Sequence, residues 1–232
     1  MTNYVSSQTA QQSAVATLFK SLYMQMAAAL TVTGLVAYFL SQSEVFFMYL
    51  VQNPSVIWIT FFVQIGLVIW MSAGLMRMSM TTATLLFILY SVSMGVTMSS
   101  IFMVYTMGSI ASVFFITAGT FFVMSLIGYL TRIDLSKIGS ILFMALIGLV
   151  IASVVNMFLG SETMYWVISY VGVIIFVGLT AFDTQKIKRM FAEYGSADEM
   201  GQKIALFGAL TLYLDFINLF LFLLRIFGGS RK

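Results

Sequence analysis

The sequence predicts an all-α, polytopic membrane protein with seven transmembrane helices, and two observations support this prediction. Of the 232 residues, 61% are hydrophobic and only 8% are charged, whereas soluble domains carry about 25% charged residues. Seven apolar segments absorb nearly the whole chain, each close to the ~20 residues that cross a bilayer as a helix. They cover residues 18–40, 55–75, 81–103, 110–130, 138–159, 165–182 and a run that begins near residue 204. We therefore expect one membrane domain over residues 18–228.

Residues 1–17 precede the first segment and are rich in Ser, Gln and Thr. They lack a basic region followed by a short apolar core and a cleavage site, so we expect a polar cytoplasmic tail and not a signal peptide. The single proline, Pro54, precedes the second segment. A proline suits the first turn of a helix because its missing N–H would be unpaired there anyway. Arg77 closes this second segment.

The third segment is rich in Ser, Thr, Met and Gly. Such residues let membrane helices approach closely and form hydrogen bonds across the contact. Short connections between the later segments indicate antiparallel neighbours. The exception is the charged stretch 183–203, which we predict to be the longest loop, with a turn at Gly195 and Ser196. Residues 229–232 are expected to form a short C-terminal tail.

The basic residues predict the orientation. If seven segments alternate, the basic positions of the first six segments lie on one side, and the opposite loops contain Glu44 and Glu162 but no Lys or Arg. These basic positions are Lys20, Arg77, Arg132, Lys137 and the cluster at 186–189. The N-terminus is therefore predicted to be cytoplasmic. Seven crossings place the C-terminus outside, where Arg225, Arg231 and Lys232 contradict the rule, so the side of the C-terminus stays open.

Two residue types are absent, which narrows the chemistry. Without cysteine the chain has no disulfides or thiolates, and without histidine it has no imidazole base, metal ligand or near-neutral proton switch. Any response to pH must therefore use carboxylates. The net charge of +3 comes from basic residues beside membrane segments, which indicates topology and not nucleic-acid binding.

Asp215 lies near the middle of the last apolar segment. A charge at the centre of a membrane helix costs ~2.5–3.5 kcal/mol on insertion scales, so the default interpretation is a functional group that faces the protein interior. Steps of three and four residues from Asp215 place a thin polar stripe on one helix face. The stripe comprises Gly208, Thr211, Asp215, Asn218, Phe222 and Arg225. Arg225 is about 15 Å from Asp215 along the axis, so it is not the direct partner.

Asp183, at the end of the sixth segment, is the candidate partner. Counting back from Asp183 in steps of three and four residues gives a second small and polar helix face. It is made of Ser169, Gly172, Phe176, Thr180 and Asp183. Two carboxyl groups that meet away from water share a proton and titrate as a pair, which predicts a proton-dependent latch. Asp215 lies about 15 Å inside its helix, measured from Ala205, so tilt or a continued sixth helix must close the gap.

Plainer interpretations stand beside these. Asp215 can hold a broken helix together through backbone hydrogen bonds, and Asp183 can be an ordinary helix-end charge paired with Lys186. Arg77 fits a cytoplasmic anchor, whose side chain reaches the membrane surface, better than a gate component. The eighteen methionines fit packing and lipid contact, because no His or Cys accompanies them.

The chain contains the motifs TAFDTQKIK at 180–188 and LYLDFINLF at 212–220. These two motifs resemble the Bax inhibitor-1 family, also called the transmembrane Bax inhibitor motif family, in its bacterial branch. The stretches SMTTATLLFILYS (79–91), SSIFMVYT (99–106) and ALIGLVIASVVNMFL (145–159) also resemble that branch, so the likeness covers about residues 77–228.

The resemblance implies a seven-helix fold with a central C-terminal helix in the bacterial cytoplasmic (inner) membrane. It also implies a pH-sensitive calcium leak whose two sensor aspartates fall on Asp183 and Asp215. An arginine at the end of the second helix is linked to the latch in such proteins, and Arg77 is the nearest match. Some members carry an acid within the second helix, whereas the region around Gln64 has none.

We therefore expect a pH-sensitive calcium (cation) leak channel, with Asp183 and Asp215 as oxygen ligands for Ca²⁺ in the ion path. Ca²⁺ is the transported ion, no other cofactor is expected, and the partners are the lipid bilayer, Ca²⁺ and protons, without nucleic acid. An intramembrane aspartyl protease also uses two aspartates, but Asp183 stands in GLTAFD and not in a GxGD motif, so we expect no enzyme. The alternative is a non-conducting modulator that binds a membrane protease or other membrane machinery.

Overall fold

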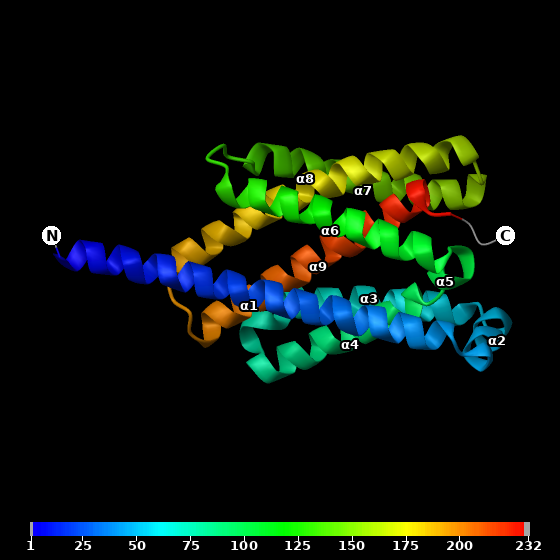
Figure 1. Ribbon diagram of the computed structural model, residues 1–232, viewed down its shortest axis with the longest axis horizontal. Helices are drawn as coiled ribbons and strands as arrows, with labels where there is room; N and C mark the ends of the chain where they lie inside the picture. Colours follow the sequence, from blue (N-terminus) through cyan, green and yellow to red (C-terminus); the bar gives the residue numbers. More distant parts are fainter. Residues whose placement is uncertain (1, 230–232) are drawn as a thin grey trace. The chain divides into compact units, whose positions relative to one another are not determined.

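The computed structural model describes residues 2–229, and the side chains of residues 11–229 (Figure 1). Within this range seven helical segments are long and apolar enough to cross a membrane, which confirms the predicted all-α, multi-pass fold. The elements are α1 (Thr2–Ser41), α2 (Glu44–Gln52), α3 (Ser55–Gly74), η1 (Leu75–Arg77), α4 (Met80–Met98), α5 (Ile101–Val104), α6 (Met107–Leu130), α7 (Ser136–Leu159), α8 (Glu162–Tyr194) and α9 (Glu199–Phe227). Residues 230–232 of the predicted C-terminal tail lie outside the described residues.

Hydroxyl side chains begin several of these helices. Ser79 precedes α4 and accepts a hydrogen bond from the N–H of Thr82, and Thr106 precedes α6 and accepts one from the N–H of Ser109. Such caps satisfy backbone donors that a helix leaves unpaired in its first turn. α7 ends at Leu159 and is followed by Gly160, whose φ of +61° is a left-handed conformation that glycine adopts without strain.

The chain divides into two compact units, and the division falls within α8 and α9. In the first unit, residues 2–105 with 190–210, α4 packs against both α1 and α3. A Cβ atom at Gly95 of α4 would lie 2.6 Å from Cβ of Val36 and 2.8 Å from the carbonyl oxygen of Thr33, so only glycine permits this approach. The Thr33 hydroxyl donates to the carbonyl of Ser91 at 2.9 Å. The small, hydroxylated third segment therefore does pack closely against a neighbouring helix.

The second unit comprises residues 106–189 with 211–229. Here α8 contacts α6, α7 and α9 through small residues. Gly128 of α6 lies against the carbonyl of Ala181, and Gly139 of α7 lies against the ring of Phe182. α9 is the most buried of the seven spans, with 67% of its most apolar stretch buried.

The predicted loop at 183–203 was wrong. α8 continues to Tyr194 and α9 begins at Glu199, so the connection is only residues 195–198, with Gly195 at φ +70°. The apolar stretch does end near Phe182, but the charged residues beyond it continue the same helix. Loss of hydropathy marks where an apolar span ends, and it does not end a helix whose polar side chains find partners.

Three smaller features also differ from the prediction. A short helix, α2, lies between the first two spans, with Ser43 accepting from the N–H of Phe46. The third span is interrupted after Met98 and continues as α5. The described part of the predicted tail, residues 2–17, belongs to α1.

Candidate functional site

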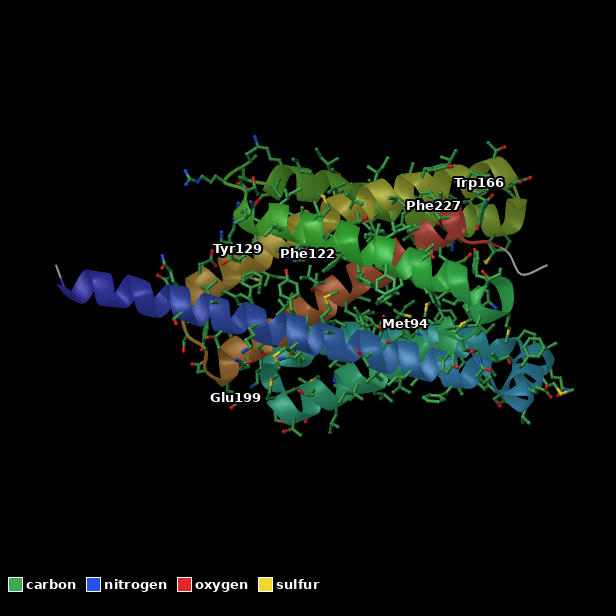
Figure 2. The ribbon with its side chains drawn as sticks, viewed as in Figure 1. Met94, Phe122, Tyr129, Trp166, Glu199 and Phe227 are labelled. Carbon is green, nitrogen blue, oxygen red and sulfur yellow. The ribbon has the colours of Figure 1, made fainter. Side chains whose placement is uncertain are left out.

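α8 and α9 run antiparallel in the second unit, and their contacts define the register of the site. Phe222 of α9 stacks on Phe176 at 5.8 Å between ring centroids and fills the space beside Gly172. One helical turn further along α9, the Arg225 guanidinium lies 5.6 Å from the ring of Tyr165. Trp166 near the start of α8 and Phe227 at the end of α9 accordingly lie at the same end of this unit (Figure 2).

The same register brings the two aspartates together. Phe176 and Phe222 are each seven residues from an aspartate, Asp183 on α8 and Asp215 on α9. The side chains of Asp183 and Asp215 hydrogen-bond to each other. Asp215 is only 5% exposed, and Asp183 is half-buried. The continued helix α8 therefore closes the gap that the sequence left between them.

A hydrogen bond between two carboxyl groups depends on their protonation. An ionised carboxylate accepts hydrogen bonds but cannot donate one, so this contact requires a proton on one of the two side chains. The second oxygen of Asp215, Oδ2, is buried and has no hydrogen-bond partner among the described residues. A lone acceptor in a water-poor place stabilises a proton or a cation close to it.

The neighbouring polar residues are paired mainly within their own helices. The Thr180 hydroxyl donates to the carbonyl of Phe176 at 2.7 Å, and the Asn218 amide donates to the carbonyl of Leu214 at 2.8 Å. Thr211 and Asn218 are half-buried, and Thr180 is fully buried. The expected polar stripe and its part in ion passage stay predictions.

The basic residues considered for the site have different positions. Lys186 is exposed on α8 and lies close enough to Asp183 for an electrostatic interaction. Arg225 is exposed and lies over the rings of Tyr165 and Phe222, which agrees with its exclusion as the partner of Asp215. Arg77 is exposed at the end of η1 in the first unit, and its part in a latch stays a prediction.

The site offers a cation few protein ligands. Across the described residues, no group of three or more Asp, Glu, His or Cys side chains could hold a metal ion together. Ca²⁺ takes six to eight oxygen ligands. The pair alone supplies at most four carboxylate oxygens, fewer than this number.

A polar contact that sequence analysis missed lies beside the pair. Gln185 is buried, and its side-chain amide donates to the carbonyl of Ile133 at 2.8 Å and accepts from the N–H of Leu135 at 2.9 Å. Lys188 donates to the carbonyl of Tyr129 at 2.6 Å and lies 4.5 Å from the centre of that ring. Tyr129 stands at the end of α6 (Figure 2), where helix carbonyls lack partners within the helix.

Arg189 completes this contact. Its guanidinium donates to Asp134 at 2.7 Å, to the Ser136 hydroxyl at 3.0 Å and to Gln185 at 2.9 Å. Hydrogen bonds from Ser136 and Arg189 hold the pKa of the Asp134 carboxyl well below its ordinary value. We call Gln185, Lys188 and Arg189 the α8 clamp. Their spacing of three and four residues was the available signal, but their partners stand 50 to 59 residues away in the sequence.

The fold and this site define a class: a multi-pass helical membrane protein with two aspartates close together on its last two spans. The family described as "Inhibitor of apoptosis-promoting Bax1" matches residues 15–232. The chain is 49% identical over 216 residues to the inner membrane protein YbhL of Escherichia coli K12, covering 93% of this chain and 92% of the relative. It is 46% identical over 207 residues to an uncharacterized protein of Borreliella burgdorferi, covering 89% of each chain.

A third relative is the uncharacterized membrane protein M6_Spy0327 of Streptococcus pyogenes, 40% identical over 181 residues and covering 78% of each chain. The family match spans nearly the whole sequence, and relatives well above 30% identity cover most of it. The chain therefore belongs to the Bax inhibitor family, as the motifs at 180–188 and 212–220 predicted. The names of the Escherichia coli and Streptococcus pyogenes relatives describe membrane proteins, and neither the family description nor these names mention an enzyme.

Proposed function

We propose that this protein is a passive, pH-sensitive pathway for cations, chiefly Ca²⁺, and that the aspartate pair controls it. The observation that carries the proposal is the hydrogen bond between Asp183 and the deeply buried Asp215. It is a contact that exists only while a proton is present. Since the chain has no histidine, carboxyl groups are the natural proton sensors near neutral pH.

The direction of the response follows from charge. While the pair holds a proton, the hydrogen bond joins α8 to α9 and the path is closed. When the pH rises and that proton leaves, two adjacent negative charges repel each other and attract a hard cation through their oxygens. Cation flux should therefore increase with pH and cease in acid.

The test is Ca²⁺ flux into liposomes that contain the purified protein, measured over a pH series with Asp183→Asn, Asp215→Asn and wild type. Asparagine keeps the shape of the side chain but neither ionises nor takes up a proton, so both variants should have a flat pH profile. Glu193→Gln is the matched control, because it neutralises an exposed acid on the same helix and should leave the profile unchanged. If Asp215→Asn and wild type show the same pH dependence, Asp215 has no part in the mechanism.

The same assay separates the alternatives. A non-conducting modulator of membrane machinery would give no flux at any pH and would instead co-purify with its partner. An aspartyl protease would cleave a membrane-helix substrate, and both aspartates would be required. Replacing Ca²⁺ by K⁺ in the same liposomes would show how far the divalent ion is favoured.

We also propose that the protein lies in the bacterial cytoplasmic membrane with its N-terminus in the cytoplasm. The basic residues and the inner-membrane relative support this placement. It puts the α6–α7 connection and residues 195–198 on the cytoplasmic side. A reporter fusion at the N-terminus should then report the cytoplasm, and an N-terminal reporter on the outer side would refute the placement.

A further inference from the structure

The stretch of α8 that carries Asp183 is held from several directions. Just before Asp183, Gly128 of α6 lies against the carbonyl of Ala181 and Gly139 of α7 lies against the ring of Phe182. These are contacts that no larger residue permits without movement. Just after Asp183, the α8 clamp joins the helix to the end of α6, to the α6–α7 connection and to the start of α7.

The clamp and the pair lie on opposite faces of α8. Gln185 follows Asp183 by two positions, and about 100° per residue turns their side chains roughly 200° apart. Gln185 therefore faces the α6–α7 connection while Asp183 faces α9. Because α8 is a rigid helix, contacts that position the face with Gln185 also position the opposite face with Asp183.

Gln185 makes the most deeply buried part of this attachment. Its amide bonds the carbonyl of Ile133 and the N–H of Leu135, as a neighbouring β-strand would, and it also accepts from Arg189. It is 6% exposed, so water does not readily replace these bonds. The Asp134–Arg189 pair is outside this buried part, with side chains 66% and 45% exposed.

We propose that Gln185 is a positioning residue for the aspartate pair: by attaching α8 to the α6–α7 connection, it holds Asp183 against Asp215. This inference uses the proposed function only for its flux measurement. In the second unit, the charged groups on the elements around the pair are few. They are Asp215 and Arg225 on α9, Glu162, Asp183, Lys186, Lys188 and Arg189 on α8, Lys137 on α7, and Arg132 and Asp134 in the connection, while α6 has none.

The first experiment measures proximity directly. The natural chain has no cysteine, so Asp183→Cys with Asp215→Cys gives a disulfide whose rate of formation under a mild oxidant reports how often the two positions meet. Adding Gln185→Met, which keeps the volume and removes the hydrogen bonds, should slow this cross-link several-fold. Asp134→Asn, a milder change at the exposed end of the clamp, should slow it less, and Glu193→Gln should not change it.

A reference pair distinguishes positioning from general loosening. Gly172→Cys with Phe222→Cys joins the same two helices at a contact remote from the clamp, and its cross-linking rate should be unaffected by Gln185→Met. Equal slowing of both pairs, or no slowing of the 183–215 pair, would overturn the inference.

Flux provides a second measurement with the aspartates intact. If Gln185 positions the pair, Gln185→Met should shift or flatten the pH profile of Ca²⁺ flux and not merely scale its amplitude. An unchanged profile beside a slowed cross-link would overturn the link between position and function. Absence of flux from the wild type would instead refute the proposed function, and the cross-linking result would still decide the inference.

Discussion

Replacing Gln185 with methionine should destabilise the protein substantially although the position is polar and lies near a helix end. The side chain makes three hydrogen bonds, to Ile133, Leu135 and Arg189, in a buried setting. Each such bond contributes about 0.5–1.5 kcal/mol net, so their loss should lower the free energy of unfolding by roughly 1.5–4.5 kcal/mol. Asp134→Asn should have a much smaller effect, because exposed ion pairs contribute little.

The measurement is unfolding by a denaturing detergent in mixed micelles, followed by the fluorescence of the three tryptophans. Methionine has nearly the volume of glutamine, so a cavity does not explain the loss. Gln185→Met within about 0.5 kcal/mol of wild type, a change typical of an ordinary surface position, would refute the reasoning. So would a larger effect from Asp134→Asn than from Gln185→Met.

Two further predictions follow from particular contacts. Hydrogen bonds from Ser136 and Arg189 keep the pKa of Asp134 below its ordinary value. The ionised Asp134 side chain therefore contributes its full stabilisation of the folded state at any pH above the ordinary carboxyl pKa. This stabilisation is lost as the pH falls through the lowered pKa of Asp134. Hydrogen exchange of residues 131–136 should therefore stay slow through mildly acidic pH and quicken only in strong acid, and quickening near neutral pH would contradict this assignment. Gly95→Ala should lower the free energy of unfolding by about 1–3 kcal/mol, since the new methyl group meets Val36 and Thr33. Gly148→Ala, where a Cβ meets nothing within 4 Å, is the matched control and should change it by less than about 1 kcal/mol; equal losses at the two glycines would contradict the close α1–α4 packing.

The seven spans could be predicted from the sequence because the bilayer imposes a simple requirement: about 20 apolar residues in a row. The pairing of Asp183 with Asp215 was also within reach. Each aspartate stands on a small and polar helix face, and an acid in hydrocarbon needs a partner. What the sequence could not supply was the register of α8 on α9, which Gly172, Phe176 and Phe222 define in the structure.

The errors have one physical cause. Charged residues after Phe182 were interpreted as a loop because hydropathy reports the solvent around a segment and not its backbone conformation. Gln185, Lys188 and Arg189 find their partners in residues 129–136, and nothing local in the sequence indicates those contacts. The helix α2 was missed for a similar reason, since nine residues between two spans are too few to show a periodic pattern.

The short connection between α8 and α9 limits how an opening motion can occur. Four residues, 195–198, join the two helices, and four fully extended residues reach only about 14 Å. Sliding α9 lengthwise by several turns relative to α8 would require a longer connection than these four residues can span. In the proposed mechanism the two carboxylates would therefore separate by turning or leaning of the helices, and lengthening the connection with added glycines should make axial sliding available as well.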